Sequence, residues 1–392
     1  MDTGALVTIA GLGATLVAMV AAVVVITPSR RSSRPAVVAT NVATFKQRSR
    51  TLRDHQTSLN IKVLDISPPS WRASGVPLLT RAGWIFDQPV PLDDVHICLN
   101  SEQRPRQALS KRELLYGLDL SGGISYSQAV TELAGMSHFT NGIIYRPIKA
   151  EFTNTVTQID FEIGNYFDYL DTGEIFGYKR SCSVSSRSLR KDGDPFEFES
   201  RTASLGILTL TIYETGGVAR FLIHKRAASV VVAPGLFHVV PAGEFAPSDI
   251  SLAAIERDFS LRRNIEREFA EELLGDIDAQ GSGGKFLDYD NEPPYRELGA
   301  AVSAGELKYY ALGLGLDPLT WKPELLTVAV FRHGSFDRIF GGGIVGNFEG
   351  TVITGSQFDC NQVDNYLNSA NTRLGTKACL QLAWKHRGTL LS

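Results

Sequence analysis

The pattern of apolar and polar positions predicts strands over much of the second half of the chain. Residues 205–213 alternate between apolar side chains and polar or threonine side chains, which is typical of a strand. Gly216-Gly217 predicts a hairpin turn into a second strand over 218–224. The apolar run 325–331 predicts a buried strand, and the amphipathic segment 374–386 predicts a closing helix. These segments together indicate a mixed sheet with helices packed on it.

The N-terminal apolar stretch has a different pattern. Residues 5–27 contain no charged side chain, and as a helix they span about 34 Å, which is enough to cross a hydrocarbon core of about 30 Å. The stretch lacks the positive segment that precedes the apolar region of a signal peptide, so we expect residues 1–28 to be a permanent transmembrane anchor. The basic residues that follow, with no acidic residue among them, are Arg30, Arg31, Arg34, Lys46, Arg48, Arg50 and Arg53. This flank predicts a single-pass protein of the cell membrane whose C-terminal domain is cytoplasmic.

The remaining pattern divides the chain into three further segments. Residues 29–78 are basic and rich in Ser and Thr, which predicts a juxtamembrane linker with a lone strand over 61–66. Residues 79–202 mix short strands and short helices, and we expect an α/β accessory region packed on the module formed by residues 203–392. The predicted fold class is therefore α+β with one N-terminal transmembrane helix.

The overall composition narrows the class of protein further. The chain has 392 residues, 43% of them hydrophobic, which is ample for a large core. A net charge of −3 argues against a general nucleic-acid binder. The four cysteines are widely separated, so no zinc motif and no dense disulfide framework is predicted, and reduced thiols in a cytoplasmic domain are the simpler explanation.

Three carboxylates are grouped in one short segment, Arg267-Glu268-Phe269-Ala270-Glu271-Glu272. Glu268, Glu271 and Glu272 stand at i, i+3 and i+4, so one face of a helix presents them together. Acidic groups this close repel each other unless a cation lies among them, and Mg²⁺ prefers such oxygen ligands, usually shared with a substrate phosphate. The plainer interpretation is an acidic helix face in solvent.

The surroundings predict that this helix borders a packed core. Asp258 or Ser260 is suited to cap its start, and Gly275 is suited to end it in a left-handed conformation. Apolar residues recur at four-residue spacing beside the carboxylates, at Ile265, Phe269 and Leu273. The acidic face is therefore expected at the edge of a core.

A short strand and a Pro-x-Gly turn over 236–245, followed by this helix, resemble the Nudix hydrolase family. The family pattern is Gly, five residues, Glu, seven residues, then Arg-Glu-hydrophobic-x-Glu-Glu-x-Gly. The resemblance implies that Glu268, Glu271 and Glu272 hold Mg²⁺ or Mn²⁺, and that the backbone near Gly243 completes the metal site. It also implies that the metal neutralises a diphosphate and lowers the pKa of an attacking water.

The resemblance assigns two further roles. Arg267 is expected to brace one of the glutamates through an ion pair, and Glu271 lies within i+4 reach. A glutamate inside or outside the helix is expected to take the proton from the attacking water, and Glu244 and Glu349 are two candidates.

The chain departs from the family pattern in the turn and before the helix. Gly243 and Arg267 are 24 positions apart, about ten more than in the pattern. Residues 246–256 are therefore expected to loop out. Asp249 occupies the position of the motif's first glutamate, and Ala242-Gly243 replaces its Gly-Gly.

The resemblance implies a membrane-anchored, divalent-metal-dependent hydrolase of a nucleoside diphosphate linked to another moiety, with a nucleotide-type small molecule as its partner. Residues 81–200 also resemble the front half of long actinobacterial proteins of unknown function that end in a divergent Nudix-like module. The insertion and the altered turn keep a second interpretation open, a catalytically inactive Nudix-like sensor that binds a nucleotide at the membrane. A third interpretation, a purely structural membrane protein, leaves the three carboxylates unexplained.

Overall fold

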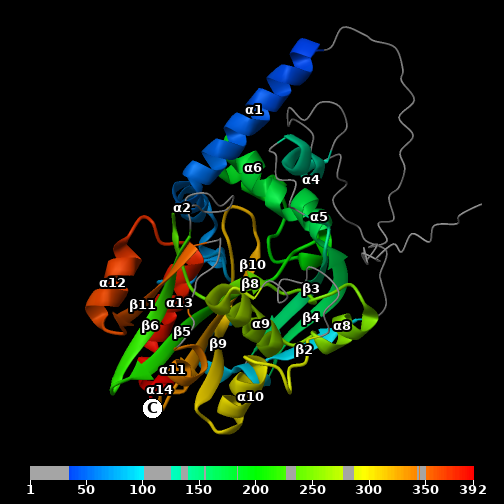
Figure 1. Cartoon of the computed structure of the whole chain (residues 1–392). Coiled ribbons are helices and arrows are strands. Elements are labelled where there is room, and N and C mark those ends of the chain that lie inside the picture. Colours follow the sequence, from blue (N-terminus) through cyan, green and yellow to red (C-terminus); the bar gives the residue numbers. More distant parts are fainter. Residues whose placement is uncertain are drawn as a thin grey trace, which may run out of the picture.

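The computed structural model describes most of the chain from Pro35 to Ser392 (Figure 1). The described residues are 35–100, 125–133, 140–153, 156–182, 184–226, 235–276, 287–341, 344 and 350–392. The segment predicted to cross the membrane, residues 5–27, lies outside them. No helix in the described ranges is both long enough and apolar enough to cross a membrane. The predicted fold class is corrected accordingly: the described fold is α+β, and its longest helix, α1 (Pro35–Asp54), carries several basic side chains.

Two helices occupy the stretch predicted as a linker with a lone strand. Helix α1 is followed directly by α2 (Gln56–Ile66), so the apolar run 61–66 is helical and not a strand. Its side chains follow a helical period, since Leu59 and Val63 are both buried on one side. Phe45 of α1 is 1% exposed and packs against the rings of Tyr126 and Tyr178, with centroid distances of 6.2 Å and 5.0 Å. These contacts fix the C-terminal half of α1 to the body of the molecule, while its first turns extend away from it (Figure 1).

A mixed sheet forms the centre of the molecule. Its strands, in spatial order, are β1 (Ile85–Pro91), β9 (Leu307–Leu316), β10 (Pro323–Phe331), β5 (Gly206–Thr215), β6 (Val218–Arg226) and β11 (Gly350–Gln357). Two short strands join beside this row, β7 (Phe237–His238) on β6 and β8 (Ala242–Glu244) on β5. The central pair β5 and β10 is parallel, whereas the other neighbours are antiparallel.

The strands predicted from periodicity are confirmed. The segments 205–213, 218–224 and 325–331 correspond to β5, β6 and β10, and both turn residues of the hairpin, Gly216 and Gly217, have positive φ angles of 59° and 73°. Strand β1 comes from the region predicted to be accessory, yet it pairs with β9 and is an edge strand of the large sheet.

Helices cover both faces of the large sheet (Figure 1). On one face, Leu208, Leu210 and Ile212 pack with α13 (Leu374–Lys385), which confirms the predicted closing helix. Near it lie α12 (Cys360–Asn368) and α14 (Arg387–Leu390). The other face carries α9 (Leu261–Leu274), α10 (Tyr295–Ser303) and α11 (Ser335–Phe340). Because both faces are covered, β10 is buried along its whole length and β5 along all but its last two residues.

A smaller sheet and a group of short helices pack against the α9 side. The small sheet has the order β2 (His96–Leu99), β4 (Thr157–Asn165) and β3 (Ile143–Phe152). The short helices are α4 (Tyr126–Gln128), α5 (Tyr166–Tyr169), α6 (Ile175–Cys182), α7 (Ser186–Lys191) and α8 (Leu252–Arg257). Single turns of 3₁₀ or π-helix lie at Pro69–Trp71, Leu92–Asp94, Ala129–Leu133, Leu170–Glu174 and Phe198–Ser200. The same apolar core runs through both sheets.

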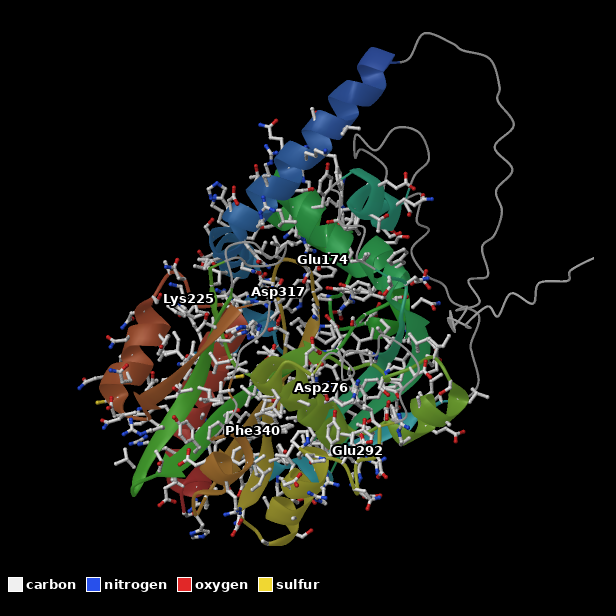
Figure 2. The ribbon with its side chains drawn as sticks, in the orientation of Figure 1. Glu174, Lys225, Asp276, Glu292, Asp317 and Phe340 are labelled. Atoms are coloured by element: carbon white, nitrogen blue, oxygen red, sulfur yellow. The ribbon has the colours of Figure 1, made fainter. Side chains whose placement is uncertain are left out.

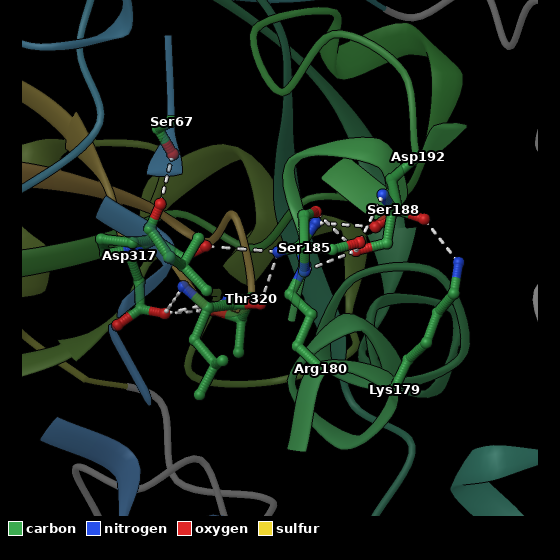
Figure 3. A network of polar contacts seen from close by, with 11 residues as sticks. Ser67, Lys179, Arg180, Ser185, Ser188, Asp192, Asp317 and Thr320 are labelled. Carbon is green, nitrogen blue, oxygen red and sulfur yellow. Dashed lines mark hydrogen bonds and ion pairs between the residues drawn. The ribbon is translucent and has the colours of Figure 1, made fainter. Parts of the chain in front are cut away.

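A buried polar network ties α6 to the loop between β9 and β10 (Figure 3). The Arg180 guanidinium donates to the Leu319 carbonyl at 2.6 Å, pairs with Asp192 at 3.1 Å, and stacks 4.2 Å from the centre of the Trp321 ring. Burial lowers the pKa of Arg180 to about 10, and Asp192 opposes that shift. On the other side of the loop, the Asp317 carboxylate accepts hydrogen bonds from the backbone amides of Leu319 and Thr320. The network fixes where β10 begins.

Candidate functional site

Local signals position the carboxylate helix as the sequence predicts. The Ser260 side chain caps the start of α9 by accepting from the Arg263 amide, and Gly275 ends the helix at φ 68°. The predicted apolar stripe of Ile265, Phe269 and Leu273 is fully buried. Its central ring, Phe269, packs 5.7 Å from Phe331 of β10, so α9 lies on the sheet with its acidic side toward β8.

Glu268 lies directly against the backbone of Gly243. In β8, Gly243 is the register partner of Ile207 on β5. A Cβ atom at position 243 would overlap the carboxylate of Glu268, whose two oxygens occupy the space that a side chain would fill. The glycine of the turn and the first glutamate of the trio, predicted to share a metal site, are therefore in contact.

Glu272 reaches the neighbouring residue of the same strand. Its carboxylate accepts a hydrogen bond from the Ala242 amide at 3.3 Å, and the residue is 4% exposed. Glu271, on the same helix face, is partly exposed. Two of the three carboxylates thus converge on β8.

The donor chemistry at this point suits a hard divalent cation. Carboxylate oxygens and a backbone carbonyl are the ligands that Mg²⁺ accepts, and one or two carboxylates are enough when a substrate phosphate supplies further oxygens. Within the described residues, no group of three or more His, Cys, Asp or Glu side chains is arranged to hold a metal ion. Glu268, Glu272 and the Gly243 backbone fit the cation in chemistry, and the complete trio is not gathered around one point.

Arg267 does not brace the glutamates as the resemblance implies. The guanidinium donates to the Ala246 carbonyl and, at 2.9 Å, to the side chain of Asn264. Asn264 in turn accepts from the Ala246 amide at 3.3 Å. Arg267 therefore holds the chain that leaves β8, because it lies on the buried side of α9 that faces this loop.

The insertion expected to loop out is folded onto the helix instead. Residues 252–257 form α8, and Asp258 behind it is completely buried. The Asp258 carboxylate accepts from the Ser248 amide at 2.8 Å and from the Tyr289 hydroxyl at 3.0 Å, and it pairs with Arg257 at 2.8 Å. Burial alone would raise the pKa of Asp258, but the hydrogen bonds from Arg257 and Ser248 outweigh it and lower the pKa. Asp249, at the position of the motif's first glutamate, accepts from the Ile250 amide.

The candidate general base on β8 is engaged in other contacts. Glu244 forms an ion pair with Lys322 and accepts from the Ser204 hydroxyl. The other candidate, Glu349, lies outside the described residues. A free carboxylate for proton transfer is therefore not available at Glu244 without breaking these contacts.

An acidic group beside Glu244 was not predicted from the sequence. The Glu174 carboxylate accepts from the Tyr169 hydroxyl at 2.8 Å, and burial raises the pKa of Glu174, with the charge of Asp317 adding to the shift and Lys322 opposing it. Glu174 and Asp317 lie between the upper helices and the sheet (Figure 2). Glu174, Glu244 and Asp317 come from three separate segments of the chain, so no spacing in the sequence indicates that they lie close together.

Two more buried glutamates were also missed. Burial raises the pKa of Glu266 on α9 and of Glu324 on β10 to about 7 each, although Arg262 and Arg373 respectively oppose the shift. In the sequence, Glu266 is one of four acidic residues in the α9 segment. Only the packing of the helix shows that Glu266 lies on a different, buried face from the three carboxylates of the candidate site.

The chain matches no known protein family in a scan against family models, and a search of the curated proteins finds no relative.

Proposed function

We propose that this chain is a divergent Nudix-type hydrolase that uses Mg²⁺ or Mn²⁺ to cleave a nucleoside diphosphate linked to another moiety. The observation that carries the proposal is the contact between the Glu268 carboxylate and the Gly243 backbone. This contact brings the first glutamate of the helix next to the glycine of the turn. The family resemblance implies that these two parts of the motif bind the same metal ion. The mixed sheet with α9 packed on it supports the same resemblance.

The proposed roles follow from the chemistry of these side chains. Glu268, Glu272 and the Gly243 carbonyl hold the divalent cation, and the partly exposed Glu271 is placed to join them when substrate binds. A bound cation neutralises the diphosphate and lowers the pKa of an attacking water. Arg267 keeps the chain after β8 in place and so preserves the Gly243 contact indirectly.

A substrate screen with the full-length chain tests the proposal. Nucleotide sugars, dinucleotides and nucleoside triphosphates are offered with Mg²⁺, with Mn²⁺ and with a chelator, and phosphate-containing products are measured. We expect turnover of at least one class only with the metal, and a loss of about a hundredfold or more in Glu268→Gln and Glu272→Gln. Glu256→Gln, an exposed glutamate of α8, is the matched control. Full activity in both site variants would show that Glu268 and Glu272 do not bind the catalytic metal.

A second function is favoured by one specific observation, the use of motif side chains in structural contacts. Glu272 accepts from a backbone amide of β8, and Arg267 holds the insertion, not a glutamate. A site built in this way suits a nucleotide sensor that binds without cleaving. Calorimetry separates the two functions, because metal-assisted nucleotide binding without product supports the sensor, and turnover supports the hydrolase.

A further inference from the structure

A pocket lies on the opposite face of the sheet from α9, next to the C-terminal helix α14. Its volume is about 320 Å³, at the lower end of the range for small-molecule sites. The residues that line it are Ile212, Tyr213, Glu214, Gly217, Ala219, Val330, Phe331, Arg332 and Leu391. Most of the lining residues are of apolar type, and the charged side chains are Glu214 and Arg332.

Strand register places these two charges side by side. The last registered residues of the parallel pair are Tyr213 on β5 and Phe331 on β10, and Glu214 and Arg332 follow them directly. Side chains alternate along a strand, so Glu214 and Arg332 share the face of Ile212 and Val330, which pack with α13. An acid and a base therefore stand next to each other inside a partly enclosed pocket.

The two charges do not neutralise each other directly. No ion pair within 4.0 Å joins Glu214 to Arg332 or to another base in the described part of the chain. Arg332 is held elsewhere, since its Nη2 donates to the Leu390 carbonyl at 2.9 Å, and its buried Nε has no acceptor among the described residues. The anchoring of Arg332 to α14 keeps the guanidinium apart from the carboxylate.

We propose that this pocket binds a small zwitterion with an ammonium group and a carboxylate, as in a free α-amino acid with an apolar side chain. The ligand carboxylate pairs with the Arg332 guanidinium and its ammonium pairs with Glu214, because partly buried charges gain most when each finds a partner. The apolar side chain lies against Val330 and Leu391. Ala219, the register partner of Glu214 on β6, leaves the space for the ligand. This site is independent of the carboxylate helix and its proposed metal.

Titration of the full-length chain with L-leucine tests the proposal. Isothermal titration calorimetry should show saturable binding with a Kd in the millimolar range or lower, and the melting temperature of the chain should rise when leucine is added. Butyrate and n-butylamine each carry one of the two charges, so they should bind about tenfold more weakly or worse. Glycine should bind more weakly than leucine because it lacks the apolar side chain.

Three variants and one control assign the binding to this pocket. Arg332→Met and Glu214→Gln each remove one charge and should weaken leucine binding about tenfold or more. Ala219→Leu fills the pocket while leaving both charged residues in the chain, and it should abolish binding, which keeps the test valid if Arg332→Met loosens α14. Arg338→Met removes an exposed arginine of α11 that pairs with Glu306, and it should bind leucine normally. Absence of saturable leucine binding, or equal binding in the Ala219→Leu variant, would overturn the proposal.

Discussion

At the scale of single residues, the position without a side chain matters as much as the charged ones. Gly243 lets the Glu268 carboxylate approach the backbone of β8, and no other residue type leaves that space open. The atoms that would be displaced belong to the end of a flexible side chain, so a larger residue at 243 moves Glu268 and leaves the strand in place.

Gly243→Ala should therefore weaken divalent-metal binding while leaving the fold intact. We expect about a tenfold loss of Mn²⁺ affinity, measured by the electron paramagnetic resonance signal of free Mn²⁺, with little change in melting temperature. Gly299→Ala in α10 is the control, because a Cβ at position 299 meets open space. Equal Mn²⁺ affinity in both variants would contradict the assigned role of Gly243.

Glu266 should make stability depend on pH. Burial raises its pKa to about 7 in the folded state, above the ordinary value of 4.5, so the folded protein binds the proton more tightly than the unfolded chain. This contribution to stability is complete below pH 4.5, falls as pH rises, and is lost above pH 7.

Glu266→Gln should remove that pH dependence because glutamine stays neutral. We expect the variant to be more stable than the parent by about 3 kcal/mol at pH 8 and equal to it near pH 4.5, measured by urea unfolding. Glu256→Gln, with an exposed side chain, should follow the parent at both pH values. A parent whose stability does not change between these pH values would contradict the raised pKa.

At the scale of elements, the insertion between β8 and α9 is a folded segment next to the candidate site. Asp258 collects hydrogen bonds from Ser248, Tyr289 and Arg257, and the Arg263 guanidinium lies 4.8 Å from the centre of the Tyr289 ring. These contacts connect α8, the start of α9 and the segment that follows α9. The chain after Gly243 is held by this connection.

Asp258→Asn should loosen the insertion and leave the sheet intact. Loss of a buried charge that accepts several hydrogen bonds should cost about 2–3 kcal/mol, measured by urea unfolding, and hydrogen exchange should increase over residues 246–257. Asp249→Asn is the control, because among the described residues its carboxylate accepts only from the Ile250 amide. Unchanged exchange in the insertion would show that Asp258 does not hold it.

Elements whose signals are local were predictable from the sequence. The strands over 205–213 and 325–331 follow from side-chain period, and α9 follows from its capping residues and apolar stripe. The run 61–66 was wrongly predicted as a strand, since a short apolar run has the same appearance in a strand and in a helix. The helical period becomes visible when Val63, inside the run, is paired with Leu59, four residues earlier and just before the run.

The residues of the candidate site could be proposed from the sequence, but only some of the contacts between them could. The meeting of Glu268 and Gly243 follows the strand, turn and helix order of the chain. The partner of Arg267 was predicted wrongly because it belongs to the insertion, whose path depends on Asp258 and Tyr289. Glu174 and Lys322 join from distant segments, and tertiary packing alone brings them together.

At the scale of the whole molecule, the two halves of the chain share one core. A continuous apolar cluster runs from Phe45 to Phe340, and β1 completes the edge of the large sheet. Trp321 is central to this connection, because Phe176 packs 4.8 Å from its ring and Arg180 stacks on it.

The described part of the chain should therefore unfold in one transition, with tryptophan fluorescence and far-ultraviolet circular dichroism changing together. Trp321→Ala should lower the unfolding free energy by about 3–5 kcal/mol and shift both signals equally. Ile250→Ala, at a residue 72% exposed, should shift neither. Two separated transitions would indicate that the halves fold independently.

The parallel pair at the centre of the sheet has a consequence for protein synthesis. The hydroxyls of Thr209 on β5 and Thr327 on β10 form a hydrogen bond, yet 118 positions separate the two residues in the sequence. Strand β5 therefore emerges from the ribosome long before β10 has been synthesised. During that interval an apolar strand has an unsatisfied edge, which is a template for aggregation. Chains terminated before residue 323 should collect in the insoluble fraction of expressing cells, and chaperone depletion should increase the same loss for the complete chain.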